Sequence, residues 1–189
     1  MRCVVRVGIL SLLVLVAGCG SSGPRTASAV TGLPEYTPEE TALFGDTMTP
    51  QVFGLPAQQS DESDLKLASR ARYADTVVPV RVSTVTREKL AGVQAFVLVL
   101  TPEGPPVVGR PPDSPLELRI QEGGPSLPRV AMADTKLVGV RFLVFLKHYV
   151  QAGEPALHFH GEADSPATRA VVKSAKRLDA PGPEVQTSP

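Results

Sequence analysis

The sequence predicts an α+β protein, a small antiparallel β-barrel or sandwich flanked by an N-terminal and a C-terminal helix. Three observations support this fold class. Alternating, β-branched segments follow one another through the middle of the chain without the strand–helix alternation of parallel sheets. Helix-capping signals stand before and after that region. The 19 prolines and 16 glycines place much of the rest in loops and linkers.

The chain divides into five segments by composition. We assign a signal peptide to residues 1–18, a flexible tether to 19–36, a short helix and loop to 37–59, a β-rich globular domain to 60–178 and a disordered tail to 179–189. The tether and the tail consist of small, polar and turn-forming residues without periodicity. One modest domain with loose ends is therefore expected.

A short helix is predicted over residues 38–44. Thr37 can cap it, Pro38 suits its first position, Glu40 completes a capping box and Gly45 is placed to end it. The proline-containing stretch that follows predicts a loop whose apolar residues press on the domain surface, although it could equally be a docking segment for a partner.

A second helix is predicted from Ser60 or Asp61 to about Ala74. Its narrow apolar stripe contains Leu67, Ala71 and Ala74. The polar side chains of the same segment, Asp64, Lys66 and Arg70, are expected to face water. We therefore expect an amphipathic helix that covers a sheet.

Four strands are predicted next. Alternation in the first puts Val78, Val80 and Val82 on one face, and Pro79 places it at an edge or a bulge. The second, 92–100, is apolar on both faces toward its end and should be a central strand. A proline-rich connection, 101–115, separates it from an alternating strand at 116–120. After a turn, the run 137–146 predicts the main core strand, with a helix as the alternative.

The last elements are a strand and a helix. Leu157 and Phe159 alternate with His158 and His160 along the strand. The helix begins with a cap at Ser165 and Pro166, and its expected apolar stripe is Ala167, Ala170, Val171, Ala175 and Leu178.

The first residues follow the order of a secretory signal, with basic residues first, then an apolar run and then small residues. The apolar run is too short to favour a membrane span. The segment Val16-Ala17-Gly18-Cys19 resembles the lipobox of bacterial lipoproteins. This resemblance implies that Cys19 receives a diacylglyceryl group on its sulfur and becomes the acylated amino terminus. The alternative is an ordinary signal peptide that happens to carry a cysteine.

The resemblance also bears on location and partners. Two or more acyl chains anchor a protein stably, and Gly20 stands where lipoproteins kept in the inner membrane often carry an aspartate, which favours the outer membrane. Cleavage would remove Cys3 together with two arginines, so the mature chain would have no free thiol and would be slightly acidic. Nucleic acid is therefore an unexpected partner, because its phosphates require a basic surface.

The histidine pair is the one candidate for site chemistry. His158 and His160 should point to the same face of their strand, where they could share Zn²⁺ or Cu²⁺ with Glu162 or Asp164, and His148 lies upstream. The competing interpretation places both imidazoles on a solvent-facing side of an outer strand. The sequence otherwise predicts no cofactor.

No recognisable catalytic motif occurs in the sequence. It lacks a G-x-S-x-G elbow, and the mature chain would have no thiol nucleophile. The glycine pair Gly123-Gly124 is followed by Pro125, which removes an amide hydrogen that a phosphate cradle would use. The leading expectation is a membrane-anchored envelope lipoprotein that is not an enzyme and binds another envelope protein. The alternative is periplasmic binding of a metal or small ligand through the histidine pair.

Overall fold

A computed structural model describes residues 32–56, 61–90, 92–112 and 115–179. The predicted signal peptide, Cys19 and most of the tether lie outside these ranges. Six strands and four α-helices follow in the order α1 (Pro38–Leu43), β1 (Thr47–Met48), the 3₁₀ helix η1 (Pro50–Phe53), α2 (Asp61–Tyr73), β2 (Thr76–Leu90), β3 (Val93–Pro102), β4 (Leu116–Gln121), α3 (Leu127–Leu137), β5 (Arg141–Gln151), β6 (Glu154–Ala163) and α4 (Pro166–Asp179).

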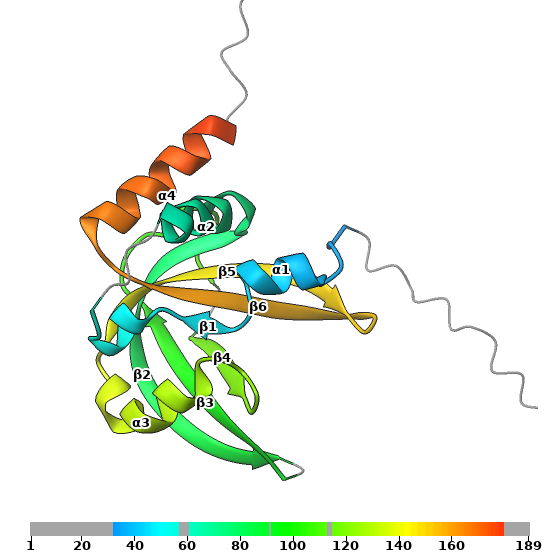
Figure 1. The fold of residues 1–189 in the computed structure, drawn as a ribbon, viewed down its shortest axis with the longest axis vertical. Helices are drawn as coiled ribbons and strands as arrows, with labels where there is room; N and C mark the ends of the chain where they lie inside the picture. The colour runs from blue at the N-terminus through cyan, green and yellow to red at the C-terminus, as the bar shows by residue number, and fades with distance from the viewer. Residues whose placement is uncertain (1–31, 57–60, 91, 113–114, 180–189) are drawn as a thin grey trace, which may run out of the picture.

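The strands form one curled sheet in the order β1-β6-β5-β2-β3-β4 (Figure 1). Its α+β character and its flanking helices were predicted, but the sheet is a half-barrel and not a closed barrel, since β1 and β4 remain edges. It is also mixed, because β1 runs parallel to β6 while every other pair is antiparallel. A strand of two residues offers too few ladder hydrogen bonds to close a barrel.

The sequence predicted that Pro79 places its strand at an edge or a bulge. The edge is wrong, because β2 lies between β5 and β3, but β2 does contain a bulge four residues after Pro79. The ladder with β3 begins only at the Val80–Pro102 pair. The carbonyl of Pro79 accepts a hydrogen bond of 2.8 Å from the amide of Glu103, so the ring nitrogen faces the side that β3 has just left. Pro79 thus lies one residue beyond the ladder with β3, where its carbonyl is bonded by Glu103 and its missing N–H breaks no ladder hydrogen bond.

A bulge lies further along β2, at Ser83. Val82 pairs with Leu100 and Thr84 with Val99, which leaves Ser83 as the extra residue. Residues three apart on a regular strand face opposite sides, yet Val82 and Val85 both pack into the same core. The bulge therefore restores the apolar face and bends the sheet.

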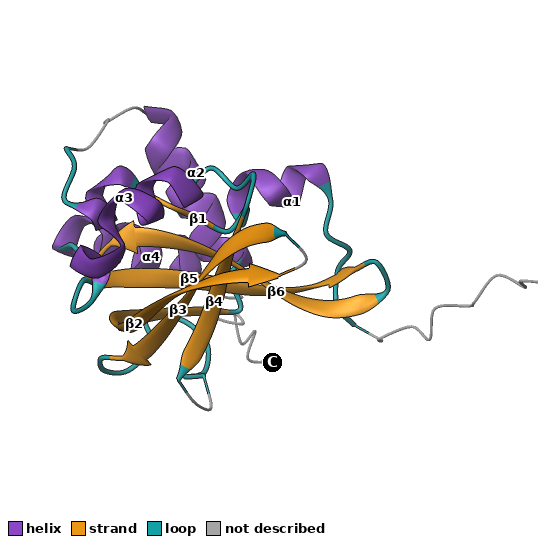
Figure 2. Cartoon of the chain, turned by 90° about the horizontal axis from the view of Figure 1, so that it is seen from below, coloured by secondary structure: helices purple, strands orange, loops and turns teal. Residues whose placement is uncertain are grey.

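Two hydrophobic cores occupy the two faces of the sheet. The first has buried side chains from all six strands, α3 and η1, and contains Phe96, Leu98, Ile120, Phe142 and Phe159. The second lies beneath α1, α2 and α4 and contains Phe44, Leu67, Ala71, Leu143, Phe145 and Tyr149. Figure 2 shows the helices gathered against the strands. The first part of β2, residues 77–80, and residues 142–146 of β5 are thus buried on both faces, which explains their nearly continuous apolar sequence.

Helix α3 was not predicted. The sequence indicated only a turn after residue 121, and a core strand from Leu137, whereas the strand starts at Arg141 and Leu137 ends α3. Pro128 lies in the first helical turn, where its missing N–H breaks no hydrogen bond. Gly139, with φ of +88°, then reverses the chain between α3 and β5.

The stripe expected on α2 is confirmed, since Leu67, Ala71 and Ala74 are all buried. The stripe expected on α4 is partly wrong. Ala175 is buried as predicted, but Val172 is the fully buried side chain at the helix centre, and Ala167 and Ala170 are exposed. Because α4 packs mainly on α2, only a narrow strip of its surface is covered.

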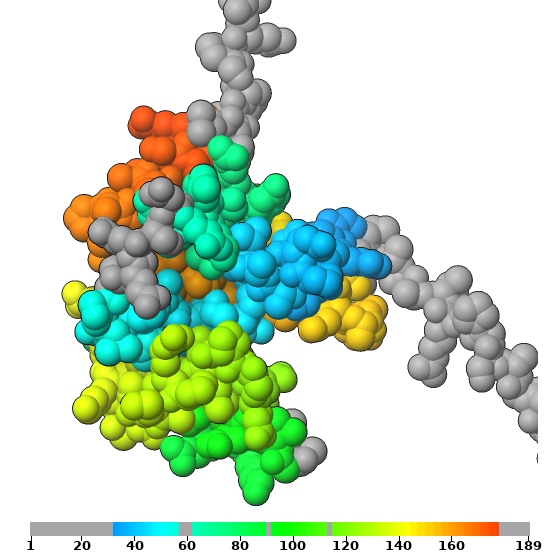
Figure 3. All heavy atoms as spheres, viewed as in Figure 1, coloured from blue at the N-terminus to red at the C-terminus, as the bar shows by residue number. Residues whose placement is uncertain are grey.

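Residues 32–56 cross the front of the molecule between two groups of elements (Figure 3). Near the start of this segment, within the expected tether, the amide of Tyr36 donates to the carbonyl of Val150 at 3.0 Å. At its centre, the amide of Met48 donates to the hydroxyl of Ser126 at 2.8 Å, in a buried contact. The proline-containing stretch expected to be a loop therefore contains β1 and η1, and its Val52 packs into the first core as anticipated.

Gly161 permits the close approach of β1 to β6. A Cβ at Gly161 would lie 2.8 Å from Cγ of Met48 and 3.2 Å from Cε2 of Phe142. We expect Gly161→Ala to lower the free energy of unfolding by about 1–3 kcal/mol through overpacking, measured by urea denaturation.

The matched control is Gly161→Ala in a Met48→Ala background, where the nearest clashing atom is absent. There the same substitution should lower the stability less. An equal loss in both backgrounds would show that the contact with Met48 does not limit the space at this position.

Candidate functional site

The predicted residues His158, His160 and Glu162 alternate along β6 and point toward α1 and α2. Leu157 and Phe159 pack into the first core, as the alternation predicted. The interpretation that the imidazoles face solvent is wrong, because His158 is 7% exposed and His160 is 3% exposed. The segment containing α1 and β1, together with α2, covers this side of β6 and converts a polar face into a buried one.

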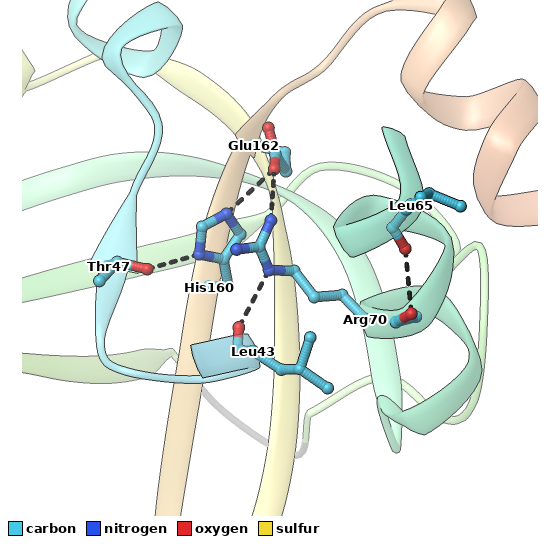
Figure 4. Close-up of polar contacts among 7 residues, drawn as sticks. Leu43, Thr47, Leu65, Arg70, His160 and Glu162 are labelled. Atoms are coloured by element: carbon cyan, nitrogen blue, oxygen red, sulfur yellow. Dashed lines mark hydrogen bonds and ion pairs between the residues drawn. The ribbon is translucent and has the colours of Figure 1, made fainter. Parts of the chain in front are cut away.

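His160 is hydrogen-bonded at both ring nitrogens (Figure 4). Its Nε2 lies 3.0 Å from Oε1 of Glu162, and its Nδ1 lies 2.5 Å from Oγ1 of Thr47. An ionised carboxylate only accepts, so Nε2 carries the proton, and Nδ1 then accepts from the Thr47 hydroxyl. Burial lowers the pKa of His160 below 6.5, and the bond to Glu162 offsets this only in part.

Arg70 joins this network from α2. Its Nη1 donates to Oε1 of Glu162 at 3.1 Å, and its Nε donates to the carbonyl of Leu43 at 3.0 Å (Figure 4). The side chains of Arg70 and Glu162 are only 10% and 14% exposed. Desolvation lowers the pKa of Arg70, while the carboxylate of Glu162 raises it. An arginine remains charged under such a shift, so this is a buried ion pair.

The prediction that Arg70 faces water is therefore wrong. A signal for its burial exists in the sequence, because Arg70 stands three residues after Leu67 and four before Ala74, on the apolar stripe itself. A charged residue on such a stripe indicates a buried partner. The sequence does not say which carboxylate that partner is.

His158 belongs to a second, neighbouring cluster. Its Nδ1 lies 3.0 Å from Oδ2 of Asp46, and its ring stacks on Tyr36 with the two centroids 3.7 Å apart. Its Nε2 is buried and has no hydrogen-bond partner among the described residues. The carboxylate therefore orients this imidazole with one nitrogen left unused.

Two tyrosines complete this second cluster. The hydroxyl of Tyr36 donates to the carbonyl of Phe44 at 2.7 Å, and the hydroxyl of Tyr149 donates to Glu40. Burial and the bond to Glu40 raise the pKa of Tyr149 well above 10. Glu40, expected to close the capping box of α1, instead ties that helix to β5, although Thr37 caps α1 as predicted.

The other candidate side chains lie elsewhere. His148 contacts Asp75, the residue just before β2, with Nδ1 and Oδ2 3.2 Å apart. Asp164 pairs with Arg169 at the start of α4. Within the described ranges, no group of three or more His, Cys, Asp or Glu side chains is placed to hold a metal ion. Cys19, the predicted lipidation site, lies outside those ranges.

The order Thr47, His160, Glu162 has the connectivity of a nucleophile, a base and an orienting carboxylate. Three features indicate a structural role for it. The imidazole is 3% exposed, Arg70 neutralises the carboxylate, and the adjacent pocket is lined by neither Thr47 nor His160.

A pocket of about 540 Å³ opens beside this network, between η1 and the first turns of α2 and α4. Arg70 and Glu162 are the most buried charged groups in its wall, and Thr49, Gln51, Leu67 and Ala163 also line it. The hydroxyl oxygen of Thr49 and the amide oxygen of Gln51 are buried without a hydrogen-bond partner among the described residues. No local pattern in the sequence marks these two residues, because only the folded chain brings η1 beside the two helices.

Comparison with protein-family models, with curated proteins and with solved structures finds no match to this chain. Among the described helices, none is both long and apolar enough to cross a membrane.

The lowered pKa of His160 predicts a loss of stability in mild acid. The unfolded chain takes up a proton near pH 6.5, whereas the folded chain does so only at a lower pH. The contribution of His160 to the free energy of unfolding should therefore be complete above pH 6.5. It should fall as the pH drops toward and through the folded-state pKa. Urea denaturation at a series of pH values measures this.

The controls separate this titration from others. His160→Asn should flatten the dependence just below pH 6.5, whereas His148→Asn, at an exposed histidine, should leave it in place. Burial opposes ionisation of Asp75, but hydrogen bonds from Lys147 and His148 outweigh it and lower the pKa of Asp75 below 3.8, so its contribution is lost only in stronger acid. A pH dependence unchanged in His160→Asn would contradict the assignment.

Proposed function

We propose that this protein is a bacterial envelope lipoprotein whose domain has a non-enzymatic binding or structural role, exerted by contact with another envelope protein. The observation that carries the proposal is Val16-Ala17-Gly18-Cys19, which directly follows a basic start and an apolar run. A diacylglyceryl group on the sulfur of Cys19 and an acyl chain on its amino group would anchor the domain stably.

The fold supports the non-enzymatic part of the proposal. The buried polar side chains of β6 are largely engaged with one another and with the backbone of α1, and so they hold elements together. Gly20 after the modified cysteine favours the outer membrane over the inner one.

Intact mass of the protein purified from its native membrane tests the anchor. We expect loss of residues 1–18 and a gain in mass from a diacylglyceryl group and an acyl chain. Cys19→Ser should abolish both changes, because it removes the sulfur that accepts the lipid. Cys3→Ser is the matched control and should leave both intact. A cleaved but unacylated wild-type protein would identify a secreted domain and contradict the anchor.

Cross-linking in intact envelopes tests the partner. A defined envelope protein should be recovered with the wild-type chain and lost when Cys19→Ser releases the domain from the membrane. A chain that stays monomeric and unlinked under these conditions would contradict the binding role.

A second candidate function is metal binding through the histidine pair, and one observation favours it. His158 donates to a carboxylate through Nδ1 and leaves Nε2 unpartnered, which is the arrangement of many metal-ligating histidines. His160 would have to release Thr47 or Glu162 to join it. Equilibrium dialysis should then show one Zn²⁺ or Cu²⁺ per chain, lost in His158→Asn and kept in His148→Asn. No stoichiometric uptake would end this alternative.

A further inference from the structure

Helices α2 and α4 pack against each other and run in the same direction. Glu62, from the start of α2, lines the same pocket as Ala167, from the start of α4. Near the other ends of the two helices, Nζ of Lys176 donates to the carbonyl of Arg72 at 2.8 Å. Like ends therefore meet, and α4 lies at the edge of the molecule, beyond α2 (Figure 1).

This arrangement separates the charges of the two helices. The acidic residues of α2 all lie in its first four positions, and they are Asp61, Glu62 and Asp64. The second half of α4 contains three basic residues, Lys173, Lys176 and Arg177, before its single acid, Asp179. Because like ends meet, one end of the helix pair is acidic and the other is basic.

Two of these basic side chains have no role within the helix pair. Lys176 bonds a terminal carbonyl of α2, a contact that the helix dipole favours. Lys173 and Arg177 instead lie one turn apart on the exposed face of α4. Among the described residues, no carboxylate lies within ion-pair distance of either. Their exposed neighbours on α4 are Ala170 and Ser174, so the two charges protrude beyond short side chains.

An exposed aromatic side chain lies at the same end. Tyr73 is the last residue of α2, directly after Arg72, and is 56% exposed. The nearby carboxylate of Asp75 is already engaged by Nζ of Lys147 at 2.6 Å and by the amide of His148. Tyrosine is enriched where membranes meet water, because its ring is apolar and its hydroxyl is polar. Basic groups beside an exposed tyrosine suit anionic headgroups above acyl chains.

A bilayer is the surface to which an anchored domain has constant access. About a dozen residues lie between Cys19 and Gly32, where the described part begins, and such a chain spans at most roughly 45 Å when fully extended. Tethering at this length gives even a weak contact a high effective concentration. Nucleic acid fits less well, because it selects basic domains, whereas this chain has no formal net charge.

We propose that the basic end of the helix pair, formed by Tyr73, Lys173, Lys176 and Arg177, docks the domain on a bilayer that carries anionic phospholipid headgroups. This inference rests on the proposed lipid anchor and adds an electrostatic contact to it. Each basic residue near an anionic surface strengthens binding about five-fold. A few such residues are enough when the anchor already holds the domain close.

The test uses fluorescence from a single reporter. The chain contains no tryptophan, so Tyr73→Trp places one at this end of α2. The acylated chain with this substitution is reconstituted in vesicles of phosphatidylcholine, or of equal parts phosphatidylcholine and phosphatidylglycerol. Only in the second should the emission shift to shorter wavelength and acrylamide quenching fall. Salt at about 1 M shortens the Debye length to roughly 3 Å and should reverse both changes.

Charge variants of the same reporter chain test the residues. Lys173→Gln and Arg177→Gln should each weaken docking about five-fold, and glutamine retains a high helix propensity. The matched controls Arg129→Gln and Lys136→Gln remove exposed charges from α3, which packs on the other face of the sheet. These controls should leave docking unchanged.

The same emission spectrum in both vesicles would overturn the docking, as would a shift that persists in the Lys173→Gln, Arg177→Gln double variant. Loss of a cross-linked envelope protein in that double variant, without any dependence on phosphatidylglycerol, would assign this end to an acidic protein instead. Intact mass of the sample distinguishes the two proposals. Acylated protein that does not dock retains the anchor, whereas unacylated protein contradicts both.

Discussion

The burial of one guanidinium, that of Arg70, constrains much of the remaining structure. An arginine removed from water must be compensated by a close carboxylate and by hydrogen bonds, and loss of one partner of such a pair costs about 3–5 kcal/mol in general. Glu162 on β6 supplies the carboxylate and the last carbonyl of α1 supplies the bond. Helix α2 can therefore occupy only one position relative to α1 and the sheet.

The same carboxylate extends this constraint to the edge of the sheet. Glu162 sets the tautomer of His160, and that tautomer requires a donor at Nδ1, which the hydroxyl of Thr47 on β1 provides. Strand β1 is then held against β6 by only two residue pairs, by the space over Gly161 and by the hydroxyl of Ser126 before α3. A short polar chain thus joins the helices over one face of the sheet to the hydrophobic core on the other.

Most single elements could be predicted, because local patterns determine them. The alternation of β4, the stripe of α2 and the caps of α1 and α4 depend on residues within one turn or one strand. Helix α3 was missed because its first turn contains a proline and because the next apolar run begins at its last residue. The site was predicted in part. His158, His160 and Glu162 do share one face of β6, but their burial and their partners Asp46, Thr47 and Arg70 depend on contacts distant in sequence.

By itself, the sequence determined the α+β class, the position of most helices and strands and the lipobox resemblance at Cys19, because periodicity, capping and segment order are encoded locally. Only the tertiary structure decided that the sheet stays an open, mixed half-barrel and that Pro79 can occupy a central strand. It also decided that a face carrying two histidines lies buried. Each of these outcomes depends on which distant segment packs against a given face, and no local pattern contains that information.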